Sequence, residues 1–92
     1  MTQGQEKQIL FLCIGNVHRS PMAEAFFNDL GPPGYRAVSA GLRPGRGVNP
    51  DAVAVMREVG QDISLYFPKP LTSDIMARSR RIISVGCDAD YL

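Results

Sequence analysis

Apolar and polar positions alternate in blocks along the chain, and each block has the length of one strand or one helix. The segment KQILFLC at 7–13 ends in a continuous apolar run, which is typical of a parallel strand buried on both faces. The segments 35–41 and 80–86 are predicted to be two further short strands. Between the strands, apolar residues recur at helical spacing in 20–30 and 50–59, so two helices are predicted there.

The first helix has recognisable start and stop signals. Ser20 is predicted to cap it, Pro21 suits its first position, and Glu24 favours the positive end of the helix dipole. Gly31 and Pro32 are expected to end it. Its predicted buried stripe consists of Met22, Phe26, Phe27 and Leu30.

The second helix is bounded in the same way. Asn49 is predicted to cap it, with Pro50 at its first position and Asp51 in its first turn. Gly60 ends it, and the glycine-rich stretch 42–48 before it is a loop. Its predicted buried stripe consists of Ala52, Val53, Val55, Met56 and Val59.

The last third of the chain completes an α/β pattern. Residues 61–70 are predicted to be irregular, and 71–79 a short helix capped by Thr72 or Ser73. The order β-α-β-α-α-β favours a three-stranded parallel sheet, in the order 2-1-3, flanked by helices. The strand at 80–86 is expected to expose an edge through which a homo-oligomer forms.

Composition narrows the class of protein. The chain has 92 residues, which suits a single domain spanning 1–92, and 45% of them are hydrophobic. A net charge of +1 argues against a nucleic-acid or membrane surface but leaves room for a local anion site. The two cysteines, Cys13 and Cys87, are too few for a disulfide scaffold, and no signal peptide or transmembrane run is seen, so a reducing cytoplasmic location is expected.

The stretch CIGNVHRS combines the residue types of an oxyanion site. Cys13 ends the first strand, at the sheet edge where open parallel sheets bind ligands. Gly15 and Asn16 tolerate a left-handed backbone, and N–H groups beside a helix N-terminus attract anions. Arg19 offers a planar fork for two oxygens, and the Ser20 hydroxyl could donate to a thiolate at Cys13. Although a buried cysteine is also a common core residue, the combination favours a nucleophile beneath a bound oxyanion.

The surrounding sequence resembles a known superfamily. ILFLCIGNVHRSPMAEAFF is similar to the signature of the low-molecular-weight protein tyrosine phosphatases, a superfamily that includes thioredoxin-coupled arsenate reductases. The similarity continues through VSAG, VNPDAVAVMREVGQDIS, PKPLT and IISVGC, from Lys7 to Cys87. The resemblance implies a flavodoxin-like fold, with the C-terminal part of the family fold absent.

The resemblance also implies roles for individual residues. Cys13 would be the nucleophile, Arg19 would bind the oxyanion and stabilise the transition state, and Ser20 would stabilise the thiolate. Asn16 would hold the loop in its strained shape, with a hydrogen bond from Ser39. The implied oxyanion-binding groups belong to Ile14, Gly15, Asn16, Val17, His18 and Arg19. No metal is implied.

Two reactions fit such a loop. The family's phosphatases use the aspartate of an Asp-Pro pair as general acid, but no Asp precedes Pro here, and Asp88 and Asp90 do not match its position. The segment 66–90 is more similar to the arsenate reductases, in which Cys87 would be a candidate redox thiol. No further cysteine follows it, so a thiol reductant such as thioredoxin, glutathione or mycothiol is expected.

The function expected first is therefore that of an arsenate reductase. The alternatives are a phosphatase acting on phosphomonoesters and, after it, a phosphate-binding module with little turnover. The partners expected are arsenate, phosphate or a phosphorylated substrate.

Several residues around the loop admit two interpretations. His18 either tunes the loop when protonated or, more in keeping with a tight loop, points its ring outward. Arg43 and Arg46 either line the rim of the pocket or belong to a solvated loop. Tyr66 and Phe67 either form a wall of the site or cover the sheet.

Overall fold

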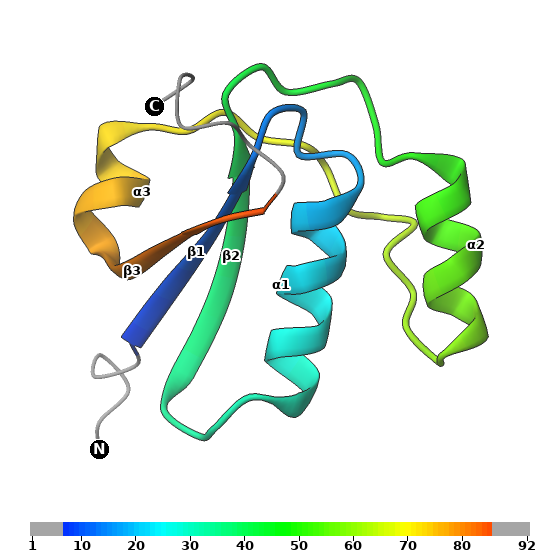
Figure 1. Ribbon diagram of the computed structural model, residues 1–92, viewed down its shortest axis with the longest axis horizontal. Coiled ribbons are helices and arrows are strands. Elements are labelled where there is room, and N and C mark those ends of the chain that lie inside the picture. Colours follow the sequence, from blue (N-terminus) through cyan, green and yellow to red (C-terminus); the bar gives the residue numbers. More distant parts are fainter. Residues whose placement is uncertain (1–6, 86–92) are drawn as a thin grey trace.

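The computed structural model describes residues 7–85, which form a three-stranded parallel sheet with helices on both sides (Figure 1). The strands are β1 (Lys7–Cys13), β2 (Tyr35–Gly41) and β3 (Ser79–Ser84). The helices are α1 (Arg19–Leu30), α2 (Pro50–Glu58) and α3 (Ser73–Arg78). The sheet order β2-β1-β3 confirms the predicted α/β class and strand order.

The central strand β1 explains the apolar run that predicted it. It pairs with β2 on one side and β3 on the other, and helices pack on both of its faces, so Ile9, Leu10 and Leu12 are buried. The parallel register sets Cys13 opposite Gly41, which places the end of β1 beside the end of β2. The sequence therefore delivers Cys13 to the carboxyl edge of the sheet, as expected of a ligand-binding position.

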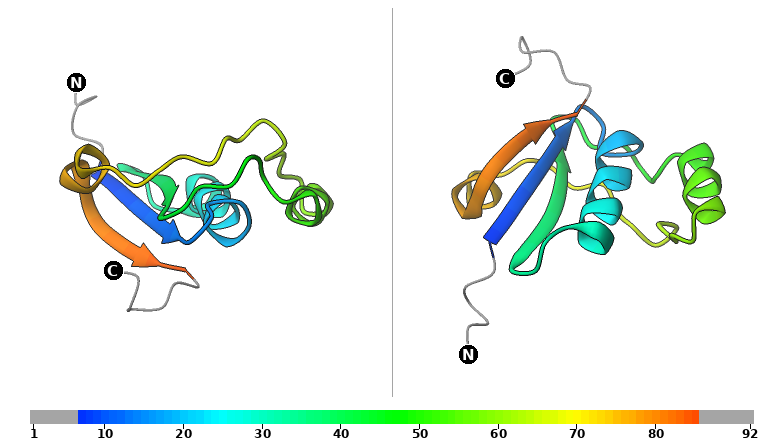
Figure 2. Two further views of the ribbon diagram at one scale, coloured as in Figure 1. Left: turned by 90° about the horizontal axis from the view of Figure 1, so that it is seen from above. Right: turned by 60° about the horizontal axis from the view of Figure 1, so that its bottom comes forward.

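The helices cover the sheet unevenly. α1 packs on β1 and β2, whereas α3 lies on the opposite side against β1 and β3 (Figures 1 and 2). This arrangement is the one that right-handed crossovers on either side of β1 produce. α2 contacts α1 and none of the strands, and together with the following loop it buries a small cluster of Ala52, Met56 and Ile63.

The irregular segment 61–70 returns to the sheet at its carboxyl edge. The Gly41 N–H donates to the Lys69 carbonyl at 2.9 Å, and the Leu71 N–H donates to the Gly41 carbonyl at 3.0 Å. These bonds form an isolated parallel bridge between Pro70 and Gly41, the last residue of β2. The predicted irregular segment is thus confirmed, and its two hydrogen bonds fix it beside Cys13's strand partner.

Two of the three predicted helix caps are confirmed. The Asn49 carboxamide oxygen accepts from the Asp51 N–H at 2.7 Å and from the Ala52 N–H at 3.4 Å, at the start of α2. The Thr72 hydroxyl accepts from the Ile75 N–H at 3.1 Å, at the start of α3. Both caps satisfy N–H groups that the first helical turn leaves without an intrahelical partner.

The predicted cap of α1 is wrong. The helix begins at Arg19, one residue before the predicted start, with His18 at the cap position and no side-chain cap bond. Ser20 lies inside the first turn because its hydroxyl is engaged by Cys13 and Asn16 instead. Glu24 lies beyond the first turn and its carboxylate accepts from Ser39, so it does not act on the helix dipole as expected.

The predicted buried stripes are only partly correct. Met56 is buried, Met22 packs against its cluster, and the Phe27 ring contacts the Phe11 ring edge-on at 5.9 Å. Val53 is half-buried against the same cluster, whereas four other apolar residues of these stripes are exposed, because each helix has a narrow covered face. These are Phe26 (39% exposed), Leu30 (75%), Val55 (54%) and Val59 (57%).

β3 is the least covered strand. Within residues 7–85 it contacts β1 and α3 only, and both Ile82 and Ile83 are largely exposed. Its outer edge is free of any strand in this part of the chain, so the homo-oligomer expected from that edge stays a prediction. No helix among the same residues combines the length and apolar character needed to cross a bilayer.

Candidate functional site

The loop that joins β1 to α1, residues 13–19, is bound along its length to residues 42–49. We call residues 13–19 the anion loop and residues 42–49 the backing segment. Four carbonyl oxygens of the anion loop accept hydrogen bonds from N–H groups of the backing segment. The pairs are Leu42 to Cys13 (3.1 Å), Arg43 to Ile14 (2.7 Å), Gly45 to Gly15 (2.9 Å) and Asn49 to Val17 (2.7 Å).

This pairing determines where the N–H groups of the anion loop point. In a planar trans peptide the N–H points opposite to the carbonyl of the preceding residue, and no cis bond occurs in residues 7–85. The N–H groups of residues 14, 15, 16 and 18 therefore point away from the backing segment. One of them, the N–H of Asn16, reaches Cys13 Sγ at 3.0 Å. Such a row of N–H groups can hold an anion.

Two glycines allow this close approach. A Cβ at Gly41 would lie 2.8 Å from the Ile14 carbonyl oxygen and 2.9 Å from the Asn16 nitrogen. A Cβ at Gly45 would lie 2.6 Å from a methyl group of Val17. Since real Cβ atoms do not approach other atoms this closely, any side chain at these positions would push the two loops apart.

Cys13 is held at the base of the anion loop by two polar neighbours. Its Sγ lies 2.8 Å from Ser20 Oγ and accepts from the Asn16 N–H, and the residue is 7% exposed. Asn16 Nδ2 donates to Ser20 Oγ at 2.8 Å, which leaves the serine hydrogen for the sulfur. Cys13 Sγ thus has two hydrogen-bond donors directed at it, the Asn16 N–H and the Ser20 hydroxyl.

Asn16 adopts the strained conformation that the loop requires. Its φ of 54° is the one positive φ at a non-glycine residue in the described range 7–85, and its side chain is fully buried. The cost of a left-handed conformation is offset by its side-chain oxygen, which accepts from the Lys69 N–H at 2.8 Å and from the Tyr66 hydroxyl at 3.1 Å. Asn16 therefore links the anion loop to the irregular segment 61–70.

The hydrogen bond that the family resemblance implies from Ser39 to Asn16 is not direct. Tyr66 lies between them, because its hydroxyl contacts both Ser39 Oγ and Asn16 Oδ1. Ser39 Oγ donates instead to Glu24 Oε1 at 2.7 Å. Tyr66 is thus a support of the anion loop, whereas the Phe67 ring, considered with it in the sequence, is 77% exposed.

Lys69 completes this group of side chains. Its Nζ lies 2.8 Å from the Tyr66 hydroxyl, 3.9 Å from Glu24 Oε1 and 4.3 Å from the centre of the Tyr66 ring. Burial lowers the pKa of Lys69, and the nearby Glu24 carboxylate opposes that shift. Burial raises the pKa of Tyr66 to about 12, so its hydroxyl keeps its hydrogen at neutral pH.

Glu24 and Lys69 are the polar members of the site that the sequence did not predict, whereas Tyr66 was one of its two alternatives. The sequence predicts Glu24 as a helix-dipole partner only and gives no role to Lys69. The available signal was the pair of prolines, Pro68 and Pro70, that stiffens the segment around Lys69. A stiff segment with a lysine inside it suits a fixed contact, but the sequence does not say with what.

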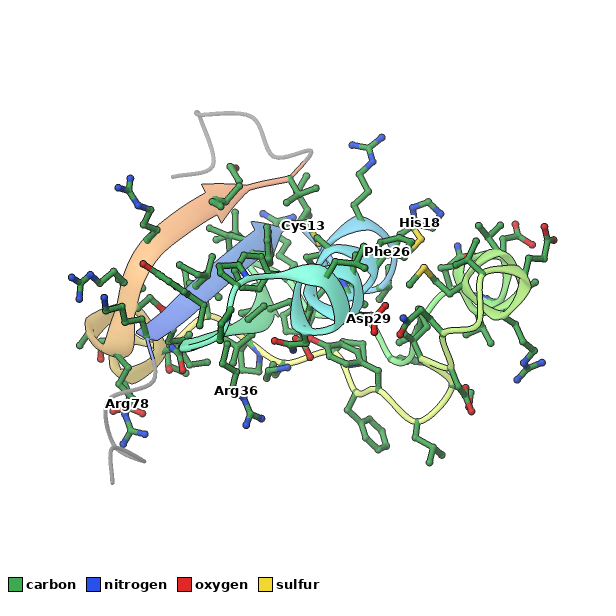
Figure 3. The ribbon with its side chains drawn as sticks, turned by 90° about the horizontal axis from the view of Figure 1, so that it is seen from below. Cys13, His18, Phe26, Asp29, Arg36 and Arg78 are labelled. Carbon is green, nitrogen blue, oxygen red and sulfur yellow. The ribbon has the colours of Figure 1, made fainter. Side chains whose placement is uncertain are left out.

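The remaining predicted residues lie at the rim. His18 is exposed and its ring points away from the ribbon (Figure 3), as the sequence favoured. Arg19 is exposed at the first position of α1, and within residues 7–85 no carboxylate pairs with it, so its guanidinium is available to an anion. Arg43 and Arg46 are exposed in the backing segment.

The candidate general acids and the second thiol cannot be placed. Cys87, Asp88 and Asp90 lie outside the described residues. In the described part of the chain, the hydrogen bonds and ion pairs of Cys13, Arg19 and Ser20 include no carboxylate. The same part contains no cluster of three or more His, Cys, Asp or Glu side chains that could hold a metal ion.

Comparison with known proteins identifies relatives of this arrangement. Residues 8–89 match the model of the family described as low molecular weight phosphotyrosine protein phosphatase. Arsenate reductase 1 of Staphylococcus epidermidis is 40% identical over 86 residues, which is 94% of this chain and 64% of that protein. The chain thus spans about two thirds of the length of the curated relatives it matches.

Solved structures agree with the sequence comparison. A thioredoxin-dependent arsenate reductase of Corynebacterium glutamicum superposes with a TM-score of 0.85 at 33% identity, over 95% of this chain and 44% of that one. A low molecular weight protein tyrosine phosphatase of T. tengcongensis superposes with a TM-score of 0.76 at 35% identity, over 85% of this chain and 57% of that one. The chain therefore belongs to the low molecular weight phosphotyrosine protein phosphatase family.

Proposed function

We propose that the protein performs cysteine-dependent chemistry on a tetrahedral oxyanion, and that its reaction is the reduction of arsenate. The observation that carries the first part is the Cys13 sulfur, which receives hydrogen bonds from the Asn16 N–H and the Ser20 hydroxyl. The second part is supported by the arsenate reductases to which the chain is similar.

The proposed roles follow from the geometry of the anion loop. The N–H groups of residues 14–18 and the Arg19 guanidinium would hold the oxygens of arsenate above Cys13 Sγ. The thiolate would displace one arsenate oxygen, which leaves as water after protonation, and a bond between Sγ and As(V) forms. Ser20 would hold the sulfur in its anionic form until that attack.

Reduction requires a second thiol. A thiolate attacks Cys13 Sγ, the electron pair of the S–As bond passes to arsenic, and arsenite, As(III), departs. The two sulfurs are left as a disulfide, which accounts for the two electrons gained by arsenic. Cys87 is the candidate internal thiol, and thioredoxin, glutathione or mycothiol are the candidate reductants of the reducing cytoplasm.

The experiment that tests this proposal measures arsenite production by the full chain with each of the three thiol systems. We expect production with at least one of them, and its loss in Cys13→Ser. Production that continues unchanged in Cys13→Ser would refute the proposal. In Cys87→Ser, loss of activity would support the internal relay, and retained activity would assign the second thiol to the reductant.

Hydrolysis of phosphomonoesters is the second candidate, favoured by the similarity to the T. tengcongensis phosphatase. The same loop would hold a phosphoryl group, but hydrolysis also needs a general acid for the leaving oxygen. Turnover of an aryl phosphate that vanishes in Cys13→Ser would support this reaction. Phosphate binding without turnover of either substrate would instead identify a binding module.

A further inference from the structure

Two residues of the irregular segment, Tyr66 and Lys69, carry contacts that neither proposed reaction uses. Both belong to a group that also contains Glu24, Ser39 and Asn16, whose members are joined by hydrogen bonds and an ion pair. This group connects by hydrogen bonds to Ser20 and Cys13. Its position makes it a candidate regulator of the sulfur.

The first step of the argument concerns the orientation of the Asn16 carboxamide. Its oxygen accepts from the Lys69 N–H and the Tyr66 hydroxyl, so its NH₂ group must face the other way, toward Ser20. The Nδ2–Ser20 Oγ distance of 2.8 Å agrees with this orientation. The two donors that bind the Asn16 side-chain oxygen therefore also fix the direction in which its NH₂ group donates.

The second step concerns the hydroxyl of Ser20. Because its oxygen accepts from Asn16 Nδ2, its single hydrogen is directed to the remaining neighbour, Cys13 Sγ at 2.8 Å. A hydroxyl that donates to sulfur stabilises the thiolate, whereas one that accepts from the thiol stabilises the neutral form. The orientation of Asn16 thus decides which form of Cys13 is favoured.

The third step concerns Lys69. Its ammonium group donates to the Tyr66 oxygen at 2.8 Å, which occupies the acceptor side of that oxygen. The Tyr66 hydrogen is then left for its other neighbours, Asn16 Oδ1, Ser39 Oγ and the Ser39 carbonyl. Glu24, 3.9 Å from Nζ, favours the charged form of Lys69 that this requires.

We propose that Tyr66 and Lys69 are positioning residues that set the reactivity of Cys13 through Asn16 and Ser20. They hold the Asn16 carboxamide with its NH₂ toward Ser20, and so direct the Ser20 hydrogen to the sulfur. The proposal rests on Cys13 being the nucleophile of the proposed function, but not on which oxyanion it attacks.

The chain supplies a matched control at the opposite end of the same strands. Lys7 Nζ lies 5.4 Å from the centre of the Tyr35 ring, and these are the first residues of β1 and β2. The pair has the same two residue types as Lys69 and Tyr66, and its side chains contact each other at the end of the strands opposite to Cys13 and Gly41. Substitutions there change the same chemical groups without touching the anion loop.

The experiment measures the rate at which iodoacetamide alkylates Cys13 as a function of pH, in a Cys87→Ser background so that one thiol reports. Tyr66→Phe removes only the hydroxyl, and Lys69→Met removes the ammonium but keeps the backbone N–H that binds Asn16. We expect each to slow alkylation at neutral pH about fivefold, the effect of one lost hydrogen bond, and to move the profile to higher pH.

The controls Tyr35→Phe and Lys7→Met are expected to leave the profile unchanged. Because Tyr66 and Lys69 act in one network, the double variant should lose less than the product of the two single losses. Profiles of Tyr66→Phe and Lys69→Met that match the controls would overturn the proposal. Should Tyr66→Phe unfold, Lys69→Met alone decides, since it leaves every backbone contact in place.

The readout needs no substrate, so it separates this proposal from the proposed function. If the unsubstituted protein reduces arsenate but the alkylation profiles of Tyr66→Phe and Lys69→Met match its own, only the positioning role is rejected. If it shows no turnover but the profiles of these variants are shifted, the positioning role is supported and the proposed reaction is rejected.

Discussion

The two strands that flank β1 both pair with it in parallel, but they differ in burial and in the segments that they contact. On one side, β2 is buried over Ser39, Ala40 and Gly41, and its end is bound to the anion loop and to Lys69. On the other side, all six residues of β3 are exposed or half-buried. Parallel pairing with the same central strand therefore gives unequal burial, because burial depends on what covers the faces of the sheet.

The difference teaches where the function is built. The candidate site uses β1, β2, α1 and the two segments 42–49 and 61–70, which contact one another through hydrogen bonds at the carboxyl edge. β3 reaches the same edge, where the Val85 N–H donates to the Leu12 carbonyl at 2.7 Å, but gives no described side chain to the site. Among the described residues, the β2 half of the sheet therefore positions the candidate site.

The largest expected effect is a difference in stability between the same kind of truncation on the central strand β1 and on its neighbour β3. Leu10 is fully buried on β1, and its register partner Ile82 on β3 is 49% exposed. Leu10→Ala should lower the free energy of unfolding by about 2–5 kcal/mol, and Ile82→Ala by less than about 1.5 kcal/mol. Urea denaturation of both variants measures this, and equal losses would show that β3 is covered in solution.

The next effect concerns the contact between the anion loop and the end of β2. A Cβ at Gly41 would meet backbone atoms within 2.9 Å, whereas one at Gly47 would meet nothing within 4 Å. Gly41→Ala should therefore cost about 1–3 kcal/mol in stability and weaken phosphate binding, since it displaces Ile14 and Asn16. Gly47→Ala is the matched control, and calorimetric titration with inorganic phosphate is the measurement. Unchanged affinity in Gly41→Ala would contradict the role of the contact between the anion loop and the end of β2.

The smallest effect is a pH dependence of stability. The pKa of Tyr66 rises from 10.0 to about 12 on folding, so the stability it contributes below pH 10 is lost as the pH rises toward 12. The pKa of Lys69 is lowered from 10.5, which gives the opposite slope up to pH 10.5 and none above it. Between pH 10.5 and about 12 the free energy of unfolding should fall, and fall less steeply in Tyr66→Phe. Parallel curves for the two proteins would show that Tyr66 is not buried as described.

Sequence reasoning succeeded where a signal was local. The apolar run before Cys13, the caps at Asn49 and Thr72 and the order of the elements all rest on neighbouring residues, and all are confirmed. It failed where a side chain could form hydrogen bonds with more than one partner. The Ser20 hydroxyl could cap a helix, but in the structure it forms hydrogen bonds with the side chains of Cys13 and Asn16.

The helical periodicity also predicted more buried residues than the structure has. Val55 and Val59 follow the helical stripe of α2 but are exposed, because α2 packs on α1 and the following loop only with the face that contains Ala52 and Met56. A hydrophobic stripe indicates which face of a helix is apolar, but its covered width depends on the neighbouring element. The exposed Phe26 and Leu30 of α1 follow the same reasoning.

By itself, the sequence determined the fold class, the strand order and the position of a cysteine-and-arginine loop at the carboxyl edge of the sheet. Those features depend on local patterns and on the handedness of crossovers. Only the tertiary structure decided how that loop is supported, because Tyr66 and Lys69 lie 50 and 53 residues from Asn16 along the chain. Contacts between residues so far apart in the sequence form only when the chain folds. No local preference of tyrosine or lysine indicates that either residue will bind the side-chain oxygen of Asn16.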